Sequence, residues 1–358
     1  MALSPARRTA FDVLRKVESG GWASDLLLAE SAALDSRDAG LASEIVFGAL
    51  RYQAQLDYLI EFYSGRARRL DAEVRIALRM GIYQLRRLER VPAHAAVGEA
   101  VDLVKRARKE SASGFVNAVL RKVDRGPVAW PTREIALSCP EWLLARWERE
   151  YGVEAAEGIA RAALRAPEKY TRGERVQDIG AQANVPLLRL EAGQTFLDLC
   201  AAPGNKTAQA LEAGVRAVAC DVHFQRIAEM RGMGASLLVV DGTRPLPFAR
   251  RFERILVDAP CSGTGTLGRN PEIKWKLRDA DLADLHGRQV ALLRNAMDVL
   301  EPGGVLVYAT CSLEREENEE VLEAAGGEPV ETLRRLPGRD PGDGFWAAVL
   351  KSQKSANG

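Results

Sequence analysis

The stretch Thr195-Phe-Leu-Asp-Leu-Cys-Ala-Ala-Pro-Gly-Asn-Lys-Thr207 decides the fold of the second half of this chain. Its apolar beginning is typical of a short buried β-strand, and the small residues that follow turn the chain sharply into a helix. The same alternation then repeats. Further strands are predicted at 216–221, 236–240, 254–258, 304–310, 330–336 and 345–350, and helices at 279–300 and 315–325. This pattern predicts an α/β domain with a doubly wound, mostly parallel sheet, whose last two strands pair antiparallel.

The first part of the chain has apolar residues at three- and four-residue spacing, which is typical of amphipathic helices. Helices are predicted over 6–17, 23–33, 39–64, 72–87, 94–108 and 113–123. Glycine and proline at 126–131 mark the end of this all-α region, and two more helices follow before the first strand. We therefore divide the chain into an all-α domain (1–126), a helical connector (127–189) and an α/β domain (190–352).

Composition narrows the class of protein. The 358 residues are 47% hydrophobic and 28% charged, which suits a globular protein with more than one domain. No run approaches the ~18 apolar residues of a membrane span, and the N-terminus lacks the apolar stretch of a secretory signal. The five cysteines have no CxxC spacing, and the three histidines are scattered, so neither a disulfide framework nor a metal site is indicated. We expect a cytoplasmic monomer without a bound metal.

Charge is unevenly distributed along the chain. Residues 1–125 carry 21 Lys and Arg against 16 Asp and Glu, whereas the whole chain has a net charge of only +1. The basic residues of the first domain occur in clusters at Arg66, Arg68, Arg69, Arg86, Arg87, Lys105, Arg106, Arg108 and Lys109. Such clusters indicate either a nucleic-acid face or ordinary solvated helix surfaces.

Two cysteines directly follow predicted strands: Cys261 in Asp258-Ala-Pro-Cys261, and Cys311 in Thr310-Cys311-Ser312. If these strands are neighbours, their ends lie ~4.8 Å apart. Ligands of open α/β sheets bind beyond the carboxyl ends of the strands, so both thiols would face whatever is bound there. A cysteine in such a place is often only a small packing residue. The pair, however, indicates covalent chemistry.

The turn after the first strand is a candidate cofactor loop. Backbone N–H groups at such a turn can hold a charged ligand, Gly204 permits its close approach, and Lys206 supplies a cation suited to a carboxylate. Asp221, at the end of the next strand, is placed to accept hydrogen bonds from ribose hydroxyls, and Asp241 would then lie near a purine. Strand-end aspartates also cap helices, and Lys206 could equally be solvated.

Residues 263–268 have the spacing GxGxxG, but the helix that a dinucleotide site requires is missing, since Pro271 interrupts the pattern. NAD is therefore not favoured. We expect this loop to fold over the two thiols as part of a substrate pocket. Trp275 either stacks on RNA or packs under the loop.

Several segments together resemble the RNA (cytosine-5)-methyltransferases of the Nop/Sun type. They are DLCAAPGNKT (198–207), the acid Asp221, DAPCSGTGTLGRNPEIKW (258–275) and ATCSLEREENEEV (309–321). The first domain is similar to the NusB-like RNA-binding domain in RTAFDVL (8–14), VFGALRY (46–52), VPAHAAV (91–97) and FVNAVLRK (115–122). The resemblance implies a Rossmann-like class I methyltransferase domain preceded by an all-α NusB-like domain.

The resemblance also implies a cofactor, a substrate and roles for residues. The cofactor would be S-adenosylmethionine and the substrate RNA, most simply 16S ribosomal RNA. The implied cofactor-binding residues are Cys200, Ala201, Ala202, Pro203, Gly204, Asn205 and Lys206 in the loop, Asp221 at the ribose, Asp241 at the adenine end, and Asp258 at the methionine side and the target base. Cys311 would be the nucleophile, and Cys261 would assist release of the methylated product.

The chemistry of cytosine agrees with these roles. C5 is too poor a nucleophile to take a methyl group until a thiolate has added to C6. A hydrogen bond to N3, which Asp258 could provide, would help that addition. The target base must also leave its stack to reach the pocket.

Two departures from the family pattern bear on substrate recognition. Asn205 stands where the family commonly has glycine, which we interpret as a tolerated change. The connector is also short, with about a dozen residues where members usually carry a small α/β RNA-binding subdomain. Two other classes stay open: an RNA-binding protein that keeps the methyltransferase core as a scaffold, and a DNA cytosine methyltransferase, which would use the Pro-Cys thiol as its nucleophile.

Overall fold

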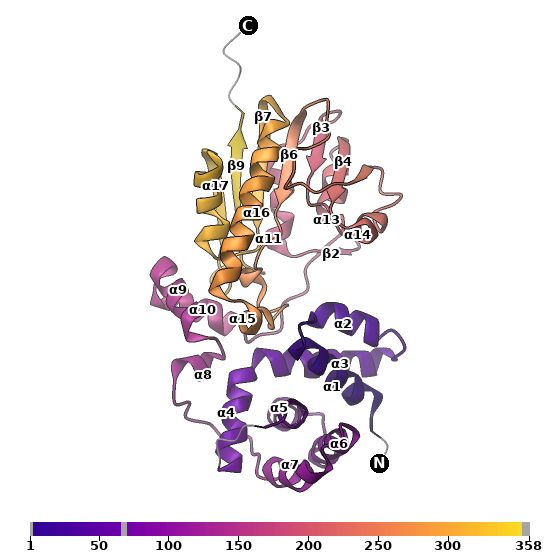
Figure 1. Ribbon diagram of the computed structural model, residues 1–358, viewed down its shortest axis with the longest axis vertical. Coiled ribbons are helices and arrows are strands. Elements are labelled where there is room, and N and C mark those ends of the chain that lie inside the picture. Colours follow the sequence, from indigo (N-terminus) through magenta and orange to yellow (C-terminus); the bar gives the residue numbers. More distant parts are fainter. Residues whose placement is uncertain (1–2, 66–69, 353–358) are drawn as a thin grey trace. The chain divides into compact units, whose positions relative to one another are not determined.

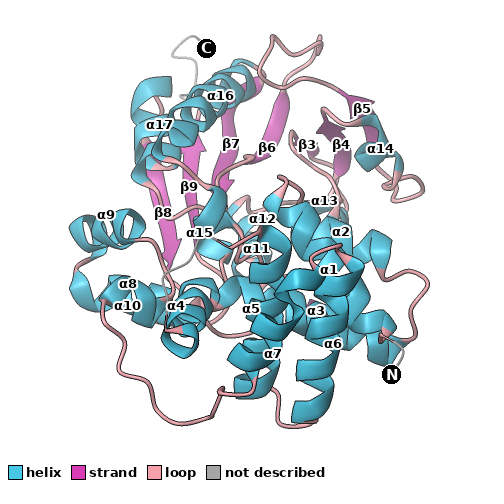
Figure 2. Ribbon diagram, turned by 60° about the horizontal axis from the view of Figure 1, so that its bottom comes forward, coloured by secondary structure: helices cyan, strands magenta, loops and turns pink. Residues whose placement is uncertain are grey.

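The computed structural model describes residues 3–65 and 70–352, shown as ribbons in Figures 1 and 2. The chain divides into two compact units. A helical unit extends to Ala166 and includes Gly268–Trp275, and a sheet unit consists of Pro167–Leu267 together with the residues from Lys276 onward. Within the described ranges, no helix is long and apolar enough to cross a membrane.

The helical unit confirms the predicted all-α domain. Its helices are α1 (Pro5–Glu18), α2 (Ala23–Glu30), α3 (Ser36–Arg51), α4 (Gln53–Ser64), α5 (Ala72–Arg87), α6 (Ala93–Arg106), α7 (Ser113–Leu120), α8 (Arg133–Leu137), α9 (Glu141–Tyr151) and α10 (Val153–Ala162). Helix α1 begins at a capping serine and turns an apolar stripe that includes Phe11 into the core. Burying one such side chain fully contributes about 1.5–3 kcal/mol.

The single helix expected over 39–64 is two helices. Helix α3 ends at Arg51 and α4 begins at Gln53, because Tyr52 between them leaves helical geometry. The Arg87 guanidinium lies over the Tyr52 ring, 4.3 Å from its centroid, and this contact holds the junction.

A segment far along the chain completes the helical unit. Residues Gly268–Trp275 belong to it, and their side chains bond to the end of α3. The buried ammonium group of Lys274 donates to the Arg51 carbonyl at 2.9 Å, and the Trp275 indole N–H donates to the Leu50 carbonyl at 2.8 Å. The loop expected over the two thiols, residues 263–268, lies outside this unit except for Gly268. Of the two interpretations of Trp275, packing is the one that these contacts favour.

The sheet unit is built on seven strands in the order β5-β4-β3-β6-β7-β9-β8. They are β3 (Thr195–Asp198), β4 (Arg216–Asp221), β5 (Ser236–Val239), β6 (Phe252–Asp258), β7 (Leu300–Thr310), β8 (Pro329–Arg335) and β9 (Phe345–Lys351). Strands β3 to β7 run parallel, and β9 pairs antiparallel with both β7 and β8. The predicted doubly wound, mostly parallel sheet is confirmed.

Helices cover both faces of this sheet, which explains why its strands are apolar throughout. On one face α16 (Asp279–Asp298) and α17 (Glu319–Ala325) pack against side chains such as Val257 and Tyr308. On the other face α12 (Asn184–Leu187), α13 (Asn205–Leu211) and α14 (Phe224–Ala228) pack against residues such as Leu256. Consecutive strand residues thus enter opposite cores.

The region expected to be a connector is divided between the units. Helices α8 to α10 lie in the helical unit, and the residues from Pro167 onward lie in the sheet unit. The latter form a two-stranded antiparallel hairpin, β1 (Thr171–Arg172) and β2 (Arg175–Val176), followed by the short helices α11 (Ile179–Gln182) and α12.

Candidate active site

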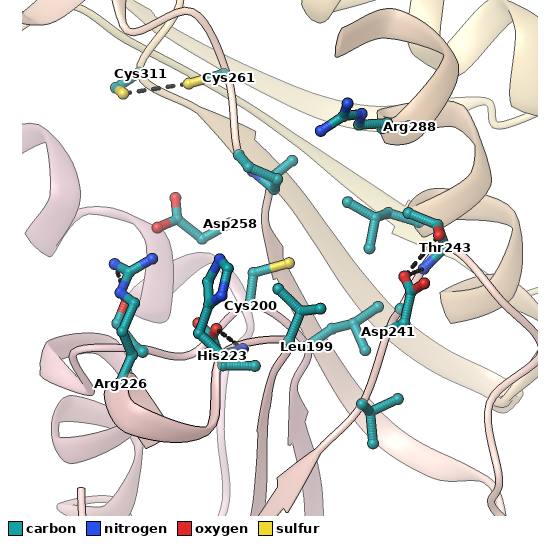
Figure 3. Close-up of a pocket in the computed structure, with 18 residues that line it drawn as sticks. Leu199, Cys200, His223, Arg226, Asp241, Thr243, Asp258, Cys261, Arg288 and Cys311 are labelled. Atoms are coloured by element: carbon teal, nitrogen blue, oxygen red, sulfur yellow. Dashed lines mark hydrogen bonds between the residues drawn. The ribbon is translucent and has the colours of Figure 1, made fainter. Parts of the chain in front are cut away.

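The carboxyl ends of the parallel strands surround one pocket of about 640 Å³. The predicted site residues that line it are Cys200, Ala202, Asp221, Asp241, Asp258, Cys261 and Cys311. These residues follow five different strands, and the parallel register of those strands brings them together. Figure 3 shows them around the pocket, with the two sulfur atoms pointing toward one another.

The other residues of the predicted cofactor loop are not among those that line this pocket. They are Ala201, Pro203, Gly204, Asn205 and Lys206. Gly204 has φ +98°, and a Cβ there would lie 2.8 Å from the Met233 side chain. Glycine is required at this turn because of backbone conformation and packing. This contact is a reason for glycine that is separate from the expected close approach of a ligand.

Asn205, the departure from the family pattern, faces the β1–β2 hairpin. Its amide donates to the Val176 carbonyl at 3.3 Å, and its side-chain oxygen accepts from Arg175 at 3.4 Å. The amide thus makes two bonds that glycine could not make. They join the cofactor loop to the segment that stands where the family's subdomain is expected.

Two strand-end acids mark the part of the pocket predicted for the nucleoside. Asp221 accepts a hydrogen bond from the backbone of His223 at 2.9 Å. Asp241 accepts from the Thr243 hydroxyl at 2.6 Å and from its N–H at 3.0 Å, and these bonds lower the pKa of Asp241. Both acids therefore have fixed orientations at the edge of the pocket.

Lys206 does not stand free for a ligand carboxylate, because it is paired with Asp258. Its ammonium group lies 2.5 Å from Asp258 Oδ2. Burial alone would lower the pKa of Lys206, but the charge of Asp258 and the hydrogen bond to it outweigh burial, so the pKa is raised. The lysine is a cation in this site, and it orients the carboxylate that faces the pocket.

Beneath this pair lies Asp198, a buried acid that the sequence did not single out. Its Oδ2 accepts from the Thr207 hydroxyl at 2.6 Å, and its Oδ1 has no hydrogen-bond partner among the described residues. Burial raises the pKa of Asp198 to about 7. The last residue of β3 and the first turn of α13 are joined by this bond.

The two thiols lie side by side, with Cys261 Sγ 3.3 Å from Cys311 Sγ. Strands β6 and β7 are adjacent and parallel, which is the condition under which both thiols were expected to face one ligand. The hydrogen bond with Cys311, burial and nearby negative charge raise the pKa of Cys261 well above its ordinary value. Cys261 is therefore a neutral thiol that can hold or supply a proton beside the Cys311 sulfur.

The other cysteines have the character of packing residues. Burial raises the pKa of Cys139 and of Cys220 to about 12, and raises the pKa of Cys200 well above its ordinary value. A thiol held neutral in this way is a poor nucleophile. Cys200 lines the pocket through its side chain but is not suited to covalent chemistry.

Sequence reasoning missed two arginines of the pocket and, besides Asp198, a second buried acid. Arg226 of α14 and Arg288 of α16 line the pocket, and their helical positions gave no signal. Glu317, which is fully buried, accepts hydrogen bonds from the residues that follow both thiols. The only sequence feature that pointed to Glu317 was an acidic run shortly after Cys311. The partners of these acids became evident only from the fold.

The GxGxxG segment (263–268) packs against the loops that carry Cys261 and Cys311, called the thiol loops below. The Gly265 N–H donates to the Cys311 carbonyl at 2.9 Å, and a Cβ at Gly265 would lie 2.7 Å from that oxygen. A short 3-10 turn (Thr264–Thr266) follows β6 where a dinucleotide fingerprint would open a helix.

Much of the basic cluster in the helical unit is engaged within that unit. Arg106 forms an ion pair with Asp12 and Lys109 one with Asp71, each at 2.8 Å, and Arg86 donates to the Gly126 carbonyl at 2.7 Å. Three other residues of the predicted face, Arg66, Arg68 and Arg69, lie outside the described residues.

The residues of the pocket suit S-adenosylmethionine, a cationic ligand with a nucleoside end. A volume of 640 Å³ falls in the usual range of small-molecule sites, and acids from β4 and β6 border it. Cys200 and Ala202 would lie beside the cofactor, with Asp221 at its ribose. No cluster of metal-ligating side chains occurs among the residues described.

Comparisons with known proteins agree with this geometry. A family model described as 16S rRNA methyltransferase RsmB/F matches residues 185–329, and the NusB family model matches residues 4–125. Ribosomal RNA small subunit methyltransferase B of Citrobacter koseri is 32% identical over 410 aligned residues, which cover 93% of this chain and 95% of the relative. This chain belongs to the RsmB/F family. The protein of the same name from Klebsiella pneumoniae is also 32% identical, over 95% of this chain and 96% of the relative.

Solved structures share the RsmB/F fold. The crystal structure of PH0851 covers 98% of this chain and 100% of its own, with a TM-score of 0.77 at 21% identity. A methyltransferase homologue from Pyrococcus horikoshii covers 61% of this chain with a TM-score of 0.52 at 23% identity. The RsmB/F family uses S-adenosylmethionine, and this cofactor is the methyl donor of the chain described here.

Proposed function

We propose that this protein methylates C5 of a cytosine in 16S ribosomal RNA, with Cys311 as the nucleophile. The observation that carries the proposal is the 3.3 Å separation of the Cys261 and Cys311 sulfur atoms in the same pocket as Asp258. A single thiol at a strand end needs no chemical explanation. Two thiols beside a carboxylate, in a family that uses S-adenosylmethionine, favour covalent activation of a base.

Cys311 adds through its thiolate to C6 of the target cytosine. The electrons of the C5–C6 double bond are then available at C5. S-adenosylmethionine, when bound, supplies an electrophilic methyl group that the activated C5 takes up. A base in the pocket takes the C5 proton, the electrons of the C5–H bond re-form the double bond, and the Cys311 thiolate is expelled. Each event requires a group that can give or take a proton near C5 and C6.

Cys261 and Asp258 are the groups placed for that purpose. Because the pKa of Cys261 is raised, its thiol stays protonated beside the Cys311 sulfur and can supply a proton to it or assist its departure. Asp258, held as a carboxylate by Lys206, faces the pocket and would accept a hydrogen bond from N3 of the pyrimidine when N3 is protonated. The proton held on N3 would draw electron density from C6 and favour attack there.

The substrate follows from family membership and from the helical unit. The relatives carry the name ribosomal RNA small subunit methyltransferase B, and residues 4–125 match the NusB family. We infer that the helical unit contributes to RNA binding. The alignment with the Citrobacter koseri relative extends over 410 residues, more than the 358 of this chain, so the relative has segments that this chain lacks. That difference supports a shortened connector over 127–189.

The experiment compares wild type with Cys311→Ala and Cys261→Ala, each incubated with 16S ribosomal RNA and radiolabelled cofactor. We expect methylation by wild type, none by Cys311→Ala, and a trapped covalent RNA adduct with Cys261→Ala. Normal methylation by Cys311→Ala would contradict the assignment of the nucleophile. Methylation of DNA in place of RNA would favour the DNA class. A wild type that binds RNA but transfers no methyl group to it would favour the scaffold class.

A further inference from the structure

The carboxylate of Glu317 receives hydrogen bonds from three separate segments. Its Oε1 accepts from the Ser262 N–H at 2.7 Å and from the Gln289 amide at 3.0 Å, and its Oε2 accepts from the hydroxyls of Ser262 and Ser312. The side chain is fully buried, and no salt bridge to it is found within the described residues. The four hydrogen bonds offset the cost of burying the charge, but an apolar side chain would avoid that cost altogether, so this arrangement has a reason other than stability.

The donors are the direct neighbours of the two thiols. Ser262 follows Cys261, and Ser312 follows Cys311. The two serine hydroxyls also lie 3.2 Å from one another. One carboxylate therefore bridges the residues that come immediately after both reactive sulfurs.

The residues that precede the thiols are held by the side chains nearest to Glu317. The Gln289 amide, which donates to Glu317, also donates to the carbonyl of Pro260 at 2.9 Å. Asn318 accepts from the Thr310 hydroxyl at 2.6 Å and donates to the Ser312 carbonyl at 3.0 Å. Each cysteine is thus fixed on both sides by a network centred on the 317–318 pair.

We propose that Glu317 is a positioning residue that holds Cys261 and Cys311 at the separation required for thiol addition and release. The roles of the two thiols rest on the proposed function, whereas the geometry that Glu317 maintains does not. The negative charge of Glu317 is also among the causes of the raised pKa of Cys261, after the hydrogen bond with Cys311 and burial. Glu317 thereby helps to keep Cys261 protonated.

The test uses Glu317→Ala, which removes the bridge, and Glu317→Gln, which keeps its shape. In the glutamine variant, the remaining oxygen can still accept from the Ser262 N–H, and both hydroxyls can turn to accept from the new amide. Glu320→Ala is the matched control, because that glutamate lies in the first turn of α17 and pairs with Arg315 at the surface. Circular dichroism and S-adenosylmethionine binding verify the fold of every variant.

The first readout is independent of methyl transfer. The protein is treated with the oxidant diamide, and mass spectrometry gives the rate of Cys261–Cys311 disulfide formation. In a separate reaction, the rate at which iodoacetamide alkylates Cys261 is measured. The readout is the first rate divided by the second. This ratio corrects for any change in thiol ionisation. We expect Glu317→Ala to lower the ratio roughly tenfold, because disulfide formation demands specific geometry. Glu317→Gln should stay within about threefold of wild type, and Glu320→Ala should be unchanged.

The second readout is the rate of methyl transfer at saturating RNA and cofactor. We expect a loss of about 100-fold for Glu317→Ala with cofactor affinity unchanged, and substantial recovery in Glu317→Gln. An unchanged disulfide ratio in Glu317→Ala, or a glutamine variant no better than alanine, would overturn the proposal. If Glu317→Ala does not fold, the double variant Ser262→Ala/Ser312→Ala takes its place with the same expectations.

The two proposals fail in distinguishable ways. A lowered disulfide ratio in a protein whose wild type methylates no RNA would support the positioning role and contradict the proposed function. Active wild type with an unaffected ratio in Glu317→Ala would do the reverse.

Discussion

The ammonium group of Lys206 lies 2.5 Å from Asp258, so the cation of the cofactor loop is bound to the acid at the end of β6. Lys206 thereby links two regions for which separate tasks were expected. Lys206 follows the turn after β3, and Asp258 precedes the Pro-Cys pair. The orientation of the Asp258 carboxylate that faces the pocket therefore depends on the loop expected to hold the cofactor.

Replacement of Lys206 should therefore affect catalysis through Asp258. We expect Lys206→Met to lower the rate of methyl transfer about 100-fold, since the carboxylate loses the partner that orients it. Lys206→Arg keeps the charge and should retain most of the rate. Steady-state kinetics on 16S ribosomal RNA measure both variants. Equal rates for the methionine and arginine variants would show that the ion pair has no role in the reaction.

Asp198 should make folding stability depend on pH in an unusual direction. Its pKa is raised to about 7 in the folded protein, so the folded state binds more protons than the unfolded state between about pH 4 and 7. Its contribution to stability is full below pH 4 and is lost as pH rises toward 7, by an amount of the order of 4 kcal/mol. Chemical denaturation of wild type and Asp198→Asn at several pH values isolates this contribution. A difference between the two that is constant from pH 4 to 7 would contradict it.

A side chain at Gly265 should separate the thiol loops. The added Cβ of Gly265→Ala would lie 2.5 Å from the Gly344 carbonyl and 2.7 Å from that of Cys311, and neither backbone can yield without moving its loop. We expect methyl transfer to fall about 100-fold, while S-adenosylmethionine binding stays close to that of wild type.

Gly287→Ala is the control for that substitution. Gly287 lies within α16 with nothing within 4 Å of an added Cβ, so alanine should stabilise the helix by about 0.5–1 kcal/mol and leave activity unchanged. Full activity in Gly265→Ala would mean that the loops tolerate separation.

The raised pKa of Cys261 predicts how the thiol reacts once its neighbour is removed. The hydrogen bond with Cys311 is the largest cause of that rise. In Cys311→Ala the pKa of Cys261 should fall toward its ordinary value, and the thiolate fraction at pH 8 should increase. We expect alkylation of Cys261 by iodoacetamide to become severalfold faster, which peptide mass spectrometry can follow. An unchanged rate would indicate that burial alone governs this thiol.

Trp275 should contribute to stability and not to RNA affinity. Trp275→Phe removes the N–H that donates to the Leu50 carbonyl, which should cost about 1 kcal/mol of unfolding free energy. Filter binding with 16S ribosomal RNA should give the wild-type dissociation constant. Weaker RNA binding by Trp275→Phe at unchanged stability would instead indicate that Trp275 stacks on RNA.

Local patterns were sufficient for the parallel sheet and for the edge at which the two thiols lie. Alternating strands and helices fix which ends of the strands coincide, so Cys261 and Cys311 were expected at the same edge, but the pattern did not give the strand order that makes them neighbours. The break at Tyr52 was not predictable in the same way, because both flanking helices are apolar at the same spacing. The contact that Arg87 makes with Tyr52 comes from another helix and is visible only in the fold.

The partners of polar side chains were the least predictable part of the site. Glu317 bonds to Ser262, 55 positions earlier, and Lys206 bonds to Asp258, 52 positions later. Nothing in the local sequence distinguishes these residues from solvated ones of the same type. Only the tertiary fold shows that Lys206 is already paired and that Glu317 is enclosed.

The membership of Gly268–Trp275 in the helical unit has a consequence for synthesis of the chain. These residues are made about a hundred positions after Ala166, where the rest of the unit ends. The packing of the helical unit can therefore be completed only after Lys274 and Trp275 have been synthesised. An N-terminal fragment cut at residue 166 would lack part of its own interior. The helical domain has its own family model, but part of its packing comes from residues far outside the stretch that the model matches.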